Sequence, residues 1–170
     1  MYNICCFRHN QASSDIKNLL AKNNIKLFDY KIAKIIYNFA IDFNYLRNFS
    51  KIILTSRNSI RTDDLANWYQ LNLQKDFIVI GNNFARYLQE NNIKNIQVFN
   101  SIRNIKNVIN NKDEYLYVRG NNTSYDLRFH HPNIQEIIYY KIKFDNLHKD
   151  KILSFLTKNK IDKKIGRAHV

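Results

Sequence analysis

The chain has 170 residues, of which 45% are hydrophobic, with three glycines, one proline and a formal net charge of +13. This composition argues against a flexible linker, a low-complexity segment, a signal peptide or a membrane span of roughly 20 apolar residues. It predicts a soluble, cytoplasmic protein with one domain or two small ones. The positive charge permits a polyanionic partner, but an A/T-rich genome would produce the same excess of lysine.

The first part of the chain is predicted to alternate between strands and helices. Residues 2–7 have the pattern of a strand. A helix follows, with a cap at Ser13 or Ser14 and a stop at Asn23-Asn24, since asparagine tolerates the left-handed conformation at a helix end. Residues 25–37 then form two short strands or one irregular strand. A short helix is expected over residues 39–48.

The central part has the pattern of a parallel sheet. Residues 51–55 contain a continuous apolar run, which is typical of a buried parallel strand. Thr55-Ser56 leads into a helix over residues 57–70, for which Thr62-Asp63-Asp64 offers a second start. A second strand, residues 77–80, is followed by Gly81 and by a helix that Asn82 is expected to cap.

The last part repeats this alternation, which predicts an α/β fold with a parallel sheet and helices on both faces. The expected elements are a helix over residues 102–109, a strand over 115–118, a helix or turn over 123–130, a strand over 134–140 and an amphipathic helix over 149–157. The final six residues, IGRAHV, match one reading frame of a common sequencing adapter. We therefore expect residues 165–170 to be a non-native tail, which is excluded from the reasoning about the fold.

Polar groups follow three of the expected strands, at Thr55-Ser56, Gly81-Asn82 and Arg119-Gly120. Ligands bind at the carboxyl ends of parallel strands, where the free N–H groups of the following helices point. We interpret the three strand ends as walls of one anion-binding cleft, in which Arg119 could contact a carboxylate. The structural alternatives are a helix cap at Thr55-Ser56, a tight turn at Gly81 and a surface ion pair at Arg119.

The sequence contains two pairs of potential metal ligands, and neither pair is expected to form a metal site. Cys5 and Cys6 are neighbours on a strand, so their side chains face opposite ways, and there is no second cysteine pair. His130 and His131 precede a proline in an expected loop and lack a third ligand. We expect the cysteines to be packed in the core and the histidines to be solvated.

Five short motifs occur in an order that resembles uroporphyrinogen-III synthase. They are Phe7-Arg8-His9, Leu54-Thr55-Ser56, Ile80–Ala85, Val118-Arg119-Gly120 and a strand that carries Tyr140. Two positions depart from the family pattern, because His9 replaces a proline and Phe84 replaces a threonine. The resemblance implies two similar parallel-sheet lobes, of which the first is discontinuous. It implies residues 1–37 and 143–164 in lobe one and 38–142 in lobe two, so that the chain looks like a fragment with lobe one truncated.

The resemblance also implies an activity. The family cyclises hydroxymethylbilane to uroporphyrinogen III in heme biosynthesis, inverting the last pyrrole ring without a metal or cofactor. Tyr140 would donate a proton or hydrogen bond to the departing hydroxyl, although packing is its structural alternative. The groups expected to bind substrate carboxylates are Arg8, Thr55, Ser56, Gly81, Asn82 and Arg119.

The resemblance predicts a monomeric lyase, with no membrane or nucleic-acid partner, and an inactive fragment for this exact chain. The alternative function is a basic nucleic-acid-binding module, which needs lysines and arginines clustered on one face and exposed aromatic residues. The lysines of this sequence are scattered instead. A third alternative is a fragment with neither activity nor partner.

Overall fold

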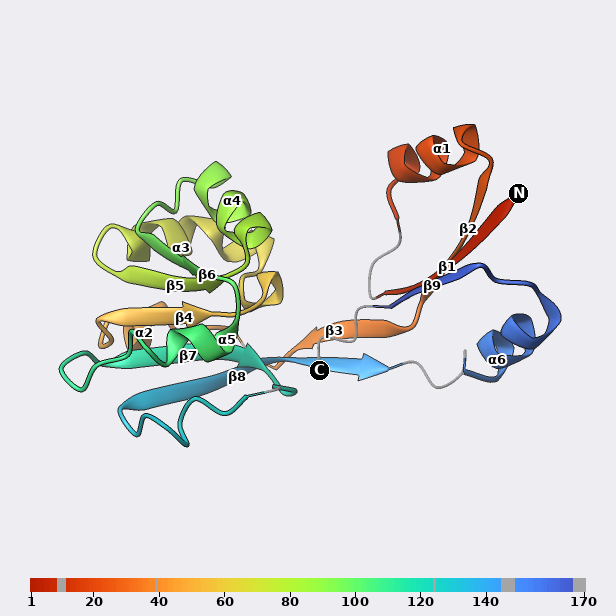
Figure 1. Ribbon diagram of the computed structural model, residues 1–170. Coiled ribbons are helices and arrows are strands. Elements are labelled where there is room, and N and C mark those ends of the chain that lie inside the picture. Colours follow the sequence, from red (N-terminus) through yellow and green to blue (C-terminus); the bar gives the residue numbers. More distant parts are fainter. Residues whose placement is uncertain (9–11, 39, 124, 145–148, 167–170) are drawn as a thin grey trace. The chain divides into compact units, whose positions relative to one another are not determined.

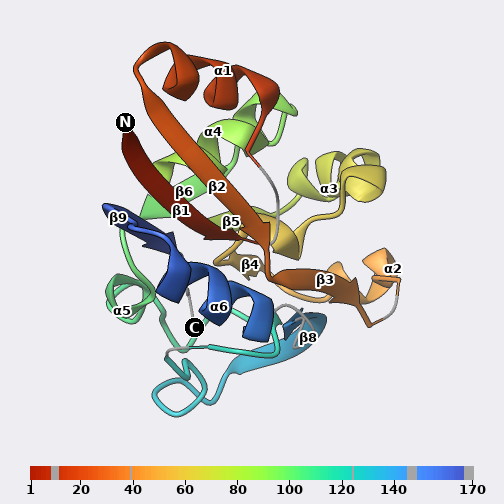
Figure 2. The same ribbon diagram turned by 90° about the vertical axis from the view of Figure 1, so that its right-hand side faces the viewer.

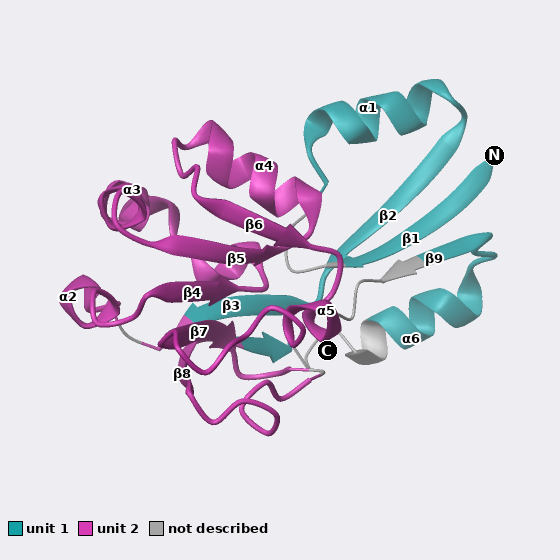
Figure 3. Ribbon diagram, turned by 60° about the vertical axis from the view of Figure 1, so that its left-hand side comes forward, with its two compact units in different colours: residues 1–36, 142–170 teal, residues 37–141 magenta. Residues whose placement is uncertain are grey.

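The computed structural model describes residues 1–8, 12–38, 40–123, 125–144 and 149–166. The chain divides into two compact units, residues 1–36 with 142–170 and residues 37–141 (Figure 3). The chain crosses between the units twice, in β3 (Ala33–Tyr37) and in β8 (Ile134–Phe144). In the described part of the chain, every helix is too short or too polar to cross a membrane.

The discontinuous unit is built on a three-stranded parallel sheet with the order β2-β1-β9. Its elements are β1 (Tyr2–Arg8), α1 (Ser14–Lys22), β2 (Ile25–Lys31), α6 (Lys149–Lys158) and β9 (Lys163–Gly166) (Figure 2). Helix α1 begins after Ser13, whose hydroxyl accepts a hydrogen bond from the Ile16 N–H, and Asn24 follows it at a φ of 56°. Helix α6 packs on β2 through Phe155, whose ring centroid lies 4.7 Å from that of Phe28.

Strand β9 includes the first two residues of the expected non-native tail, residues 165–170. Ile165 and Gly166 pair with Cys6 and Phe7 of β1 in parallel register. The Asp162 N–H also donates to the Asn3 carbonyl at 3.0 Å, which sets this register. Residues 167–170 lie outside the described residues.

The continuous unit contains a sheet with the strand order β3-β8-β7-β4-β5-β6, in which the pairs from β8 to β6 are parallel (Figure 1). Its further elements are α2 (Phe43–Leu46), β4 (Lys51–Leu54), α3 (Leu65–Asn72), β5 (Asp76–Ile80), α4 (Asn82–Glu90), β6 (Ile96–Phe99), α5 (Ile102–Ile105) and β7 (Tyr115–Gly120).

Both faces of the central strands are buried, as their continuous apolar sequences predict. On one face, Ile53, Ile78 and Tyr117 form a cluster with Ile105 of α5 and Leu127. The opposite face is covered by helices, where the α3 residue Trp68 lies with its ring centroid 5.9 Å from that of Phe77. The sheet is therefore the middle layer, and in sheets of this kind ligands bind at the carboxyl ends of the strands.

Two expected helices are shorter in the structure, and the third, over residues 57–70, begins after its second expected start, Thr62-Asp63-Asp64. Residues 40–48 form only α2, and residues 102–109 form only α5. Residues 57–70 form two 3₁₀ turns before α3, because Ser59 is fully buried and donates to the Val118 carbonyl at 2.9 Å. This bond holds the chain against β7, so a continuous helix cannot start at Ser56.

Candidate functional site

The carboxyl ends of β4, β5, β7 and β8 meet at one edge of the sheet. Leu54 pairs with both Val79 and Val118, and Gly120 pairs with Tyr140. The structure thus brings together the predicted groups Thr55, Ser56, Gly81, Asn82, Arg119 and Tyr140. Arg8 is the exception, since it ends β1 in the discontinuous unit.

A β-bulge in β8 places Tyr140 over the end of β7. The register advances from Arg119–Ile138 to Gly120–Tyr140, which leaves Tyr139 as the additional residue. Tyr140 is only 5% exposed, and burial raises the pKa of its phenol. Hydrogen bonds with the Ser56 side chain and the Gly120 backbone and the charge of Arg119 oppose this rise in pKa. The Tyr140 hydroxyl therefore stays protonated at neutral pH and lies beside Ser56.

The ring of Tyr140 leaves no room for a side chain at position 120. A β-carbon on Gly120 would lie 2.6 Å from Cε2 and 2.7 Å from Cζ of the Tyr140 ring. Ring atoms of a buried tyrosine cannot retreat without moving the strand. The Arg-Gly motif thus has a packing reason in this chain, because only glycine leaves room for the ring.

We expect Gly120→Ala to lower the free energy of unfolding by about 1–3 kcal/mol, as overpacking of a core does. Urea unfolding measures the change. In a Tyr140→Ala background the same substitution should cost little, because the ring that causes the clash is gone. An equal cost in both backgrounds would show that the clash with Tyr140 is not the cause.

Thr55 is held by a tyrosine that sequence reasoning missed. The Thr55 Oγ1 and the Tyr117 Oη are 3.0 Å apart and share a hydrogen bond. Tyr117 is 2% exposed, and burial raises its pKa while hydrogen bonds with Thr55 and Thr123 oppose this. In the sequence, Tyr117 lies two residues before Arg119 on a predicted strand. This spacing indicates only that the two side chains lie on the same face of the sheet. The bond to Thr55 requires the pairing of β4 with β7.

Arg119 forms an ion pair within the chain, as its structural alternative predicted, but this pair is buried rather than at the surface. Its Nη2 donates to Glu136 Oε2 at 2.8 Å, and its Nη1 donates to the Gly120 carbonyl at 2.9 Å. Arg119 is only 8% exposed, so it is neither a surface ion pair nor a free carboxylate ligand. Arg128 also reaches Glu136 Oε2, at 3.2 Å. Arg119 and Glu136 thus form a buried ion pair behind the strand end, and the 54% exposed Arg128 reaches the same carboxylate from the surface.

Gly81 rather than Asn82 caps α4. Gly81 has a φ of +88°, and no atom lies within 4 Å of the place a β-carbon would take. Its N–H donates to the Phe99 carbonyl at 2.9 Å, and exposed Asn82 is the first residue of the helix. The N-terminus of α4 is therefore open to solvent at the strand edge. Phe84 lies in the core at 7% exposure and is not part of this opening.

The strand edge also carries a pH-dependent contribution to stability. Burial raises the pKa values of Tyr117, Tyr139 and Tyr140 above the ordinary 10.0. The native chain keeps these protons where the unfolded chain releases them, so the free energy of unfolding should fall as pH rises above about 10. Urea unfolding at about pH 8 and about pH 10.5 measures this, and Tyr139→Phe should reduce the fall. Equal stability of the native chain at both values would contradict it.

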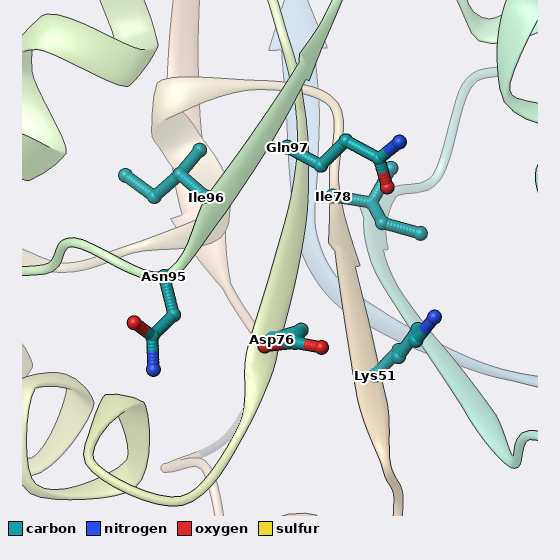
Figure 4. Close-up of a pocket in the computed structure, with 6 residues that line it drawn as sticks. All are labelled: Lys51, Asp76, Ile78, Asn95, Ile96 and Gln97. Atoms are coloured by element: carbon teal, nitrogen blue, oxygen red, sulfur yellow. The ribbon is translucent and has the colours of Figure 1, made fainter.

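A cavity of about 250 Å³ lies near the amino ends of β4, β5 and β6. It is lined by Lys51, Asp76, Ile78, Asn95, Ile96 and Gln97 (Figure 4). Lys51 and Asp76 are the first residues of β4 and β5 and pair in register. The Lys51 ammonium forms an ion pair with Asp113 at 3.0 Å, which raises the pKa of Lys51. This cavity contains none of the predicted site residues, so the carboxyl edge remains the candidate site.

No protein-family model and no curated protein matches this sequence. Among solved structures, the chain is similar to uroporphyrinogen-III synthetase from Helicobacter pylori 26695, with 16% identity and a TM-score of 0.56, over 91% of this chain and 68% of that one. It is also similar to a mutant uroporphyrinogen III synthase from Thermus thermophilus, with 10% identity and a TM-score of 0.58, over 98% and 72% of the two chains. The predicted resemblance and α/β fold class are confirmed, and the chain has the uroporphyrinogen-III synthase fold.

Proposed function

We propose that the chain is a uroporphyrinogen-III synthase, a cytoplasmic lyase that cyclises hydroxymethylbilane to uroporphyrinogen III in heme biosynthesis. The observation that carries the proposal is the meeting of Thr55, Ser56 and Tyr140 at one strand edge, in a fold that uroporphyrinogen-III synthases share. The substrate is a linear tetrapyrrole with eight carboxylates, so the protein must bind acid groups and bring two ends together.

Tyr140 would assist the departure of the terminal hydroxyl. Its raised pKa keeps the phenol neutral, so that it can donate a hydrogen bond or a proton as the hydroxyl leaves as water. The methylene carbon left behind bonds to the substituted α carbon of the last pyrrole ring, which gives a spiro intermediate. The bond from that α carbon to its original bridging methylene then breaks and re-forms at the free α carbon of the inverted ring, which releases a proton. The pyrroles supply the electron pair, so the proposal needs no metal or cofactor.

Thr55, Ser56 and the first turn of α4 would bind substrate carboxylates. Thr55 and Ser56 are partly exposed, and the hydroxyl of Thr55 is oriented by Tyr117. The α4 terminus has free N–H groups that favour an anion. Arg119 would act behind this surface, where its charge opposes the rise in the Tyr140 pKa.

An isomer assay of the purified chain tests the proposal. Hydroxymethylbilane is added and the oxidised porphyrins are separated, because closure without ring inversion gives the type I isomer. We expect type III product above the uncatalysed background, a result that would also contradict the inactivity expected of this exact chain as a fragment. Type I product alone, from chain that is folded by circular dichroism, would contradict the proposal.

A further inference from the structure

Arg57 directly follows Ser56 and stacks on a tyrosine of the neighbouring strand–helix connection. Its Cζ lies 3.9 Å from the ring centroid of Tyr87. Tyr87 belongs to α4 and is partly buried, and its carbonyl accepts a hydrogen bond from the Asn91 side chain at 2.8 Å. The contact therefore joins the segment after β4 to the helix after β5.

Stacking leaves the edge of the guanidinium available. A guanidinium that lies flat on an aromatic ring keeps its N–H donors in the plane, pointing away from the ring. Arg57 is exposed, and no carboxylate of the described residues forms an ion pair with it. The contact with Tyr87 restrains the guanidinium, and its N–H groups can donate to a carboxylate in bidentate geometry.

The other arginines near Tyr140 are already neutralised. Arg61 forms ion pairs with Asp63 at 3.4 Å and Asp64 at 3.8 Å, and Arg119 is paired with Glu136. The charges of Arg61 and Arg57 both oppose the burial that raises the pKa of Tyr37. The Tyr37 ring lies 6.4 Å from the Tyr140 ring, which places the Arg57 charge near the candidate site.

We propose that Arg57, held on Tyr87, binds a carboxylate of the ligand at this strand edge, the role that the sequence suggested for Arg119. The identity of the ligand as a tetrapyrrole rests on the proposed function. The two parallel donors of a guanidinium suit a carboxylate or a phosphate, and the proposed substrate supplies carboxylates. Tyr87 is then a positioning residue, which acts through Arg57.

Direct binding tests this role without turnover. The probe is uroporphyrin III, which carries eight carboxylates, titrated by its own fluorescence, with its uncharged octamethyl ester as the ligand control. We expect Arg57→Ala to raise Kd about tenfold, as the loss of a charge-assisted hydrogen bond does. Arg57→Lys should recover less than half of the binding free energy that Arg57→Ala loses. Tyr87→Leu should also raise Kd, although it removes no charge.

Arg47→Ala is the matched control, because Arg47 is also exposed but ends α2 just before β4 begins. It should leave Kd within about twofold. The proposal is overturned if the native chain does not bind uroporphyrin III, if Arg57→Ala leaves Kd unchanged, or if Arg47→Ala weakens binding equally. It is also overturned if a duplex oligonucleotide binds more tightly than uroporphyrin III and depends on Arg57, since phosphate is then the ligand.

The outcome separates this proposal from the enzymatic one. Binding that depends on Arg57 without any type III product would contradict the synthase function and support a carboxylate site. Where type III product forms, Arg57→Ala and Tyr87→Leu should raise KM and leave kcat within about twofold, because the contact exists before the reaction. A fall in kcat at unchanged KM would contradict a binding role.

Discussion

Replacing Glu136 with glutamine should lower the free energy of unfolding by about 3–5 kcal/mol, the cost of leaving a buried charge unpaired. The Glu136 side chain is 4% exposed and that of Arg119 is 10% exposed, with 2.8 Å between Oε2 and Nη2. Glutamine keeps the shape of glutamate but removes the countercharge, so Arg119 would remain buried beside a neutral amide. Urea unfolding followed by circular dichroism measures the loss.

Asp126→Asn is the matched control for this substitution. Arg128, which also forms an ion pair with Glu136, has its Nε 3.9 Å from Asp126 Oδ1. The Asp126 side chain, however, is 51% exposed. Its loss should change the free energy of unfolding by less than about 0.5 kcal/mol, because surface pairs are screened by water. The double substitution of Arg119→Met with Glu136→Leu should recover most of the stability, since it removes both charges. A loss below about 1 kcal/mol for Glu136→Gln would contradict a buried pair.

Tyr140→Phe should lower kcat for hydroxymethylbilane by about 10²–10⁴-fold, the usual contribution of a positioned proton donor. This prediction rests on the proposed function. The phenylalanine ring would still lie over Gly120, so the packing that fixes the β-bulge remains. Single-turnover kinetics with the native chain as reference measures the change, and thermal unfolding checks that the fold is retained.

The adjacent Tyr139 supplies the control. Its hydroxyl donates to Asp64 Oδ2 at 3.1 Å, and its side chain is fully buried. Tyr139→Phe should lower the free energy of unfolding by about 1 kcal/mol through the lost hydrogen bond. It should leave kcat within severalfold, because this hydroxyl faces Asp64. An equal loss of kcat for both variants would assign the Tyr140 effect to structure rather than to proton donation.

Local patterns were sufficient wherever one stretch of chain decides its own conformation. The apolar run in β4 predicted a buried parallel strand, and β4 pairs in parallel on both sides. The Asn-Asn stops are confirmed, since Asn24 and Asn92 have φ values of 56° and 63° after α1 and α4. A strand run and a helix stop depend on propensities within a few residues, which a sequence displays directly.

The sequence also predicted which strands end in polar residues and that these ends meet at one edge of the sheet. Parallel strands place their carboxyl ends together, so Thr55-Ser56 and Gly81-Asn82 had to share one edge once the alternation of strands and helices was recognised. The start of the helix between them was left open, and α3 begins at the second of the two expected starts, after Thr62-Asp63-Asp64. Ser59 is bonded to Val118 across 59 residues of sequence, and periodicity within the segment from 57 to 70 does not reveal this bond.

The roles of individual side chains were decided only by the tertiary structure. Arg119 faces Glu136 because β7 lies beside β8, and Arg57 lies on Tyr87 because the turn after β4 lies beside α4. The sequence alone determined an α/β chain with polar strand ends. Which cation is neutralised and which is free depends on pairs that are far apart in the sequence, and such pairs form only when the sheet and its register bring them into contact.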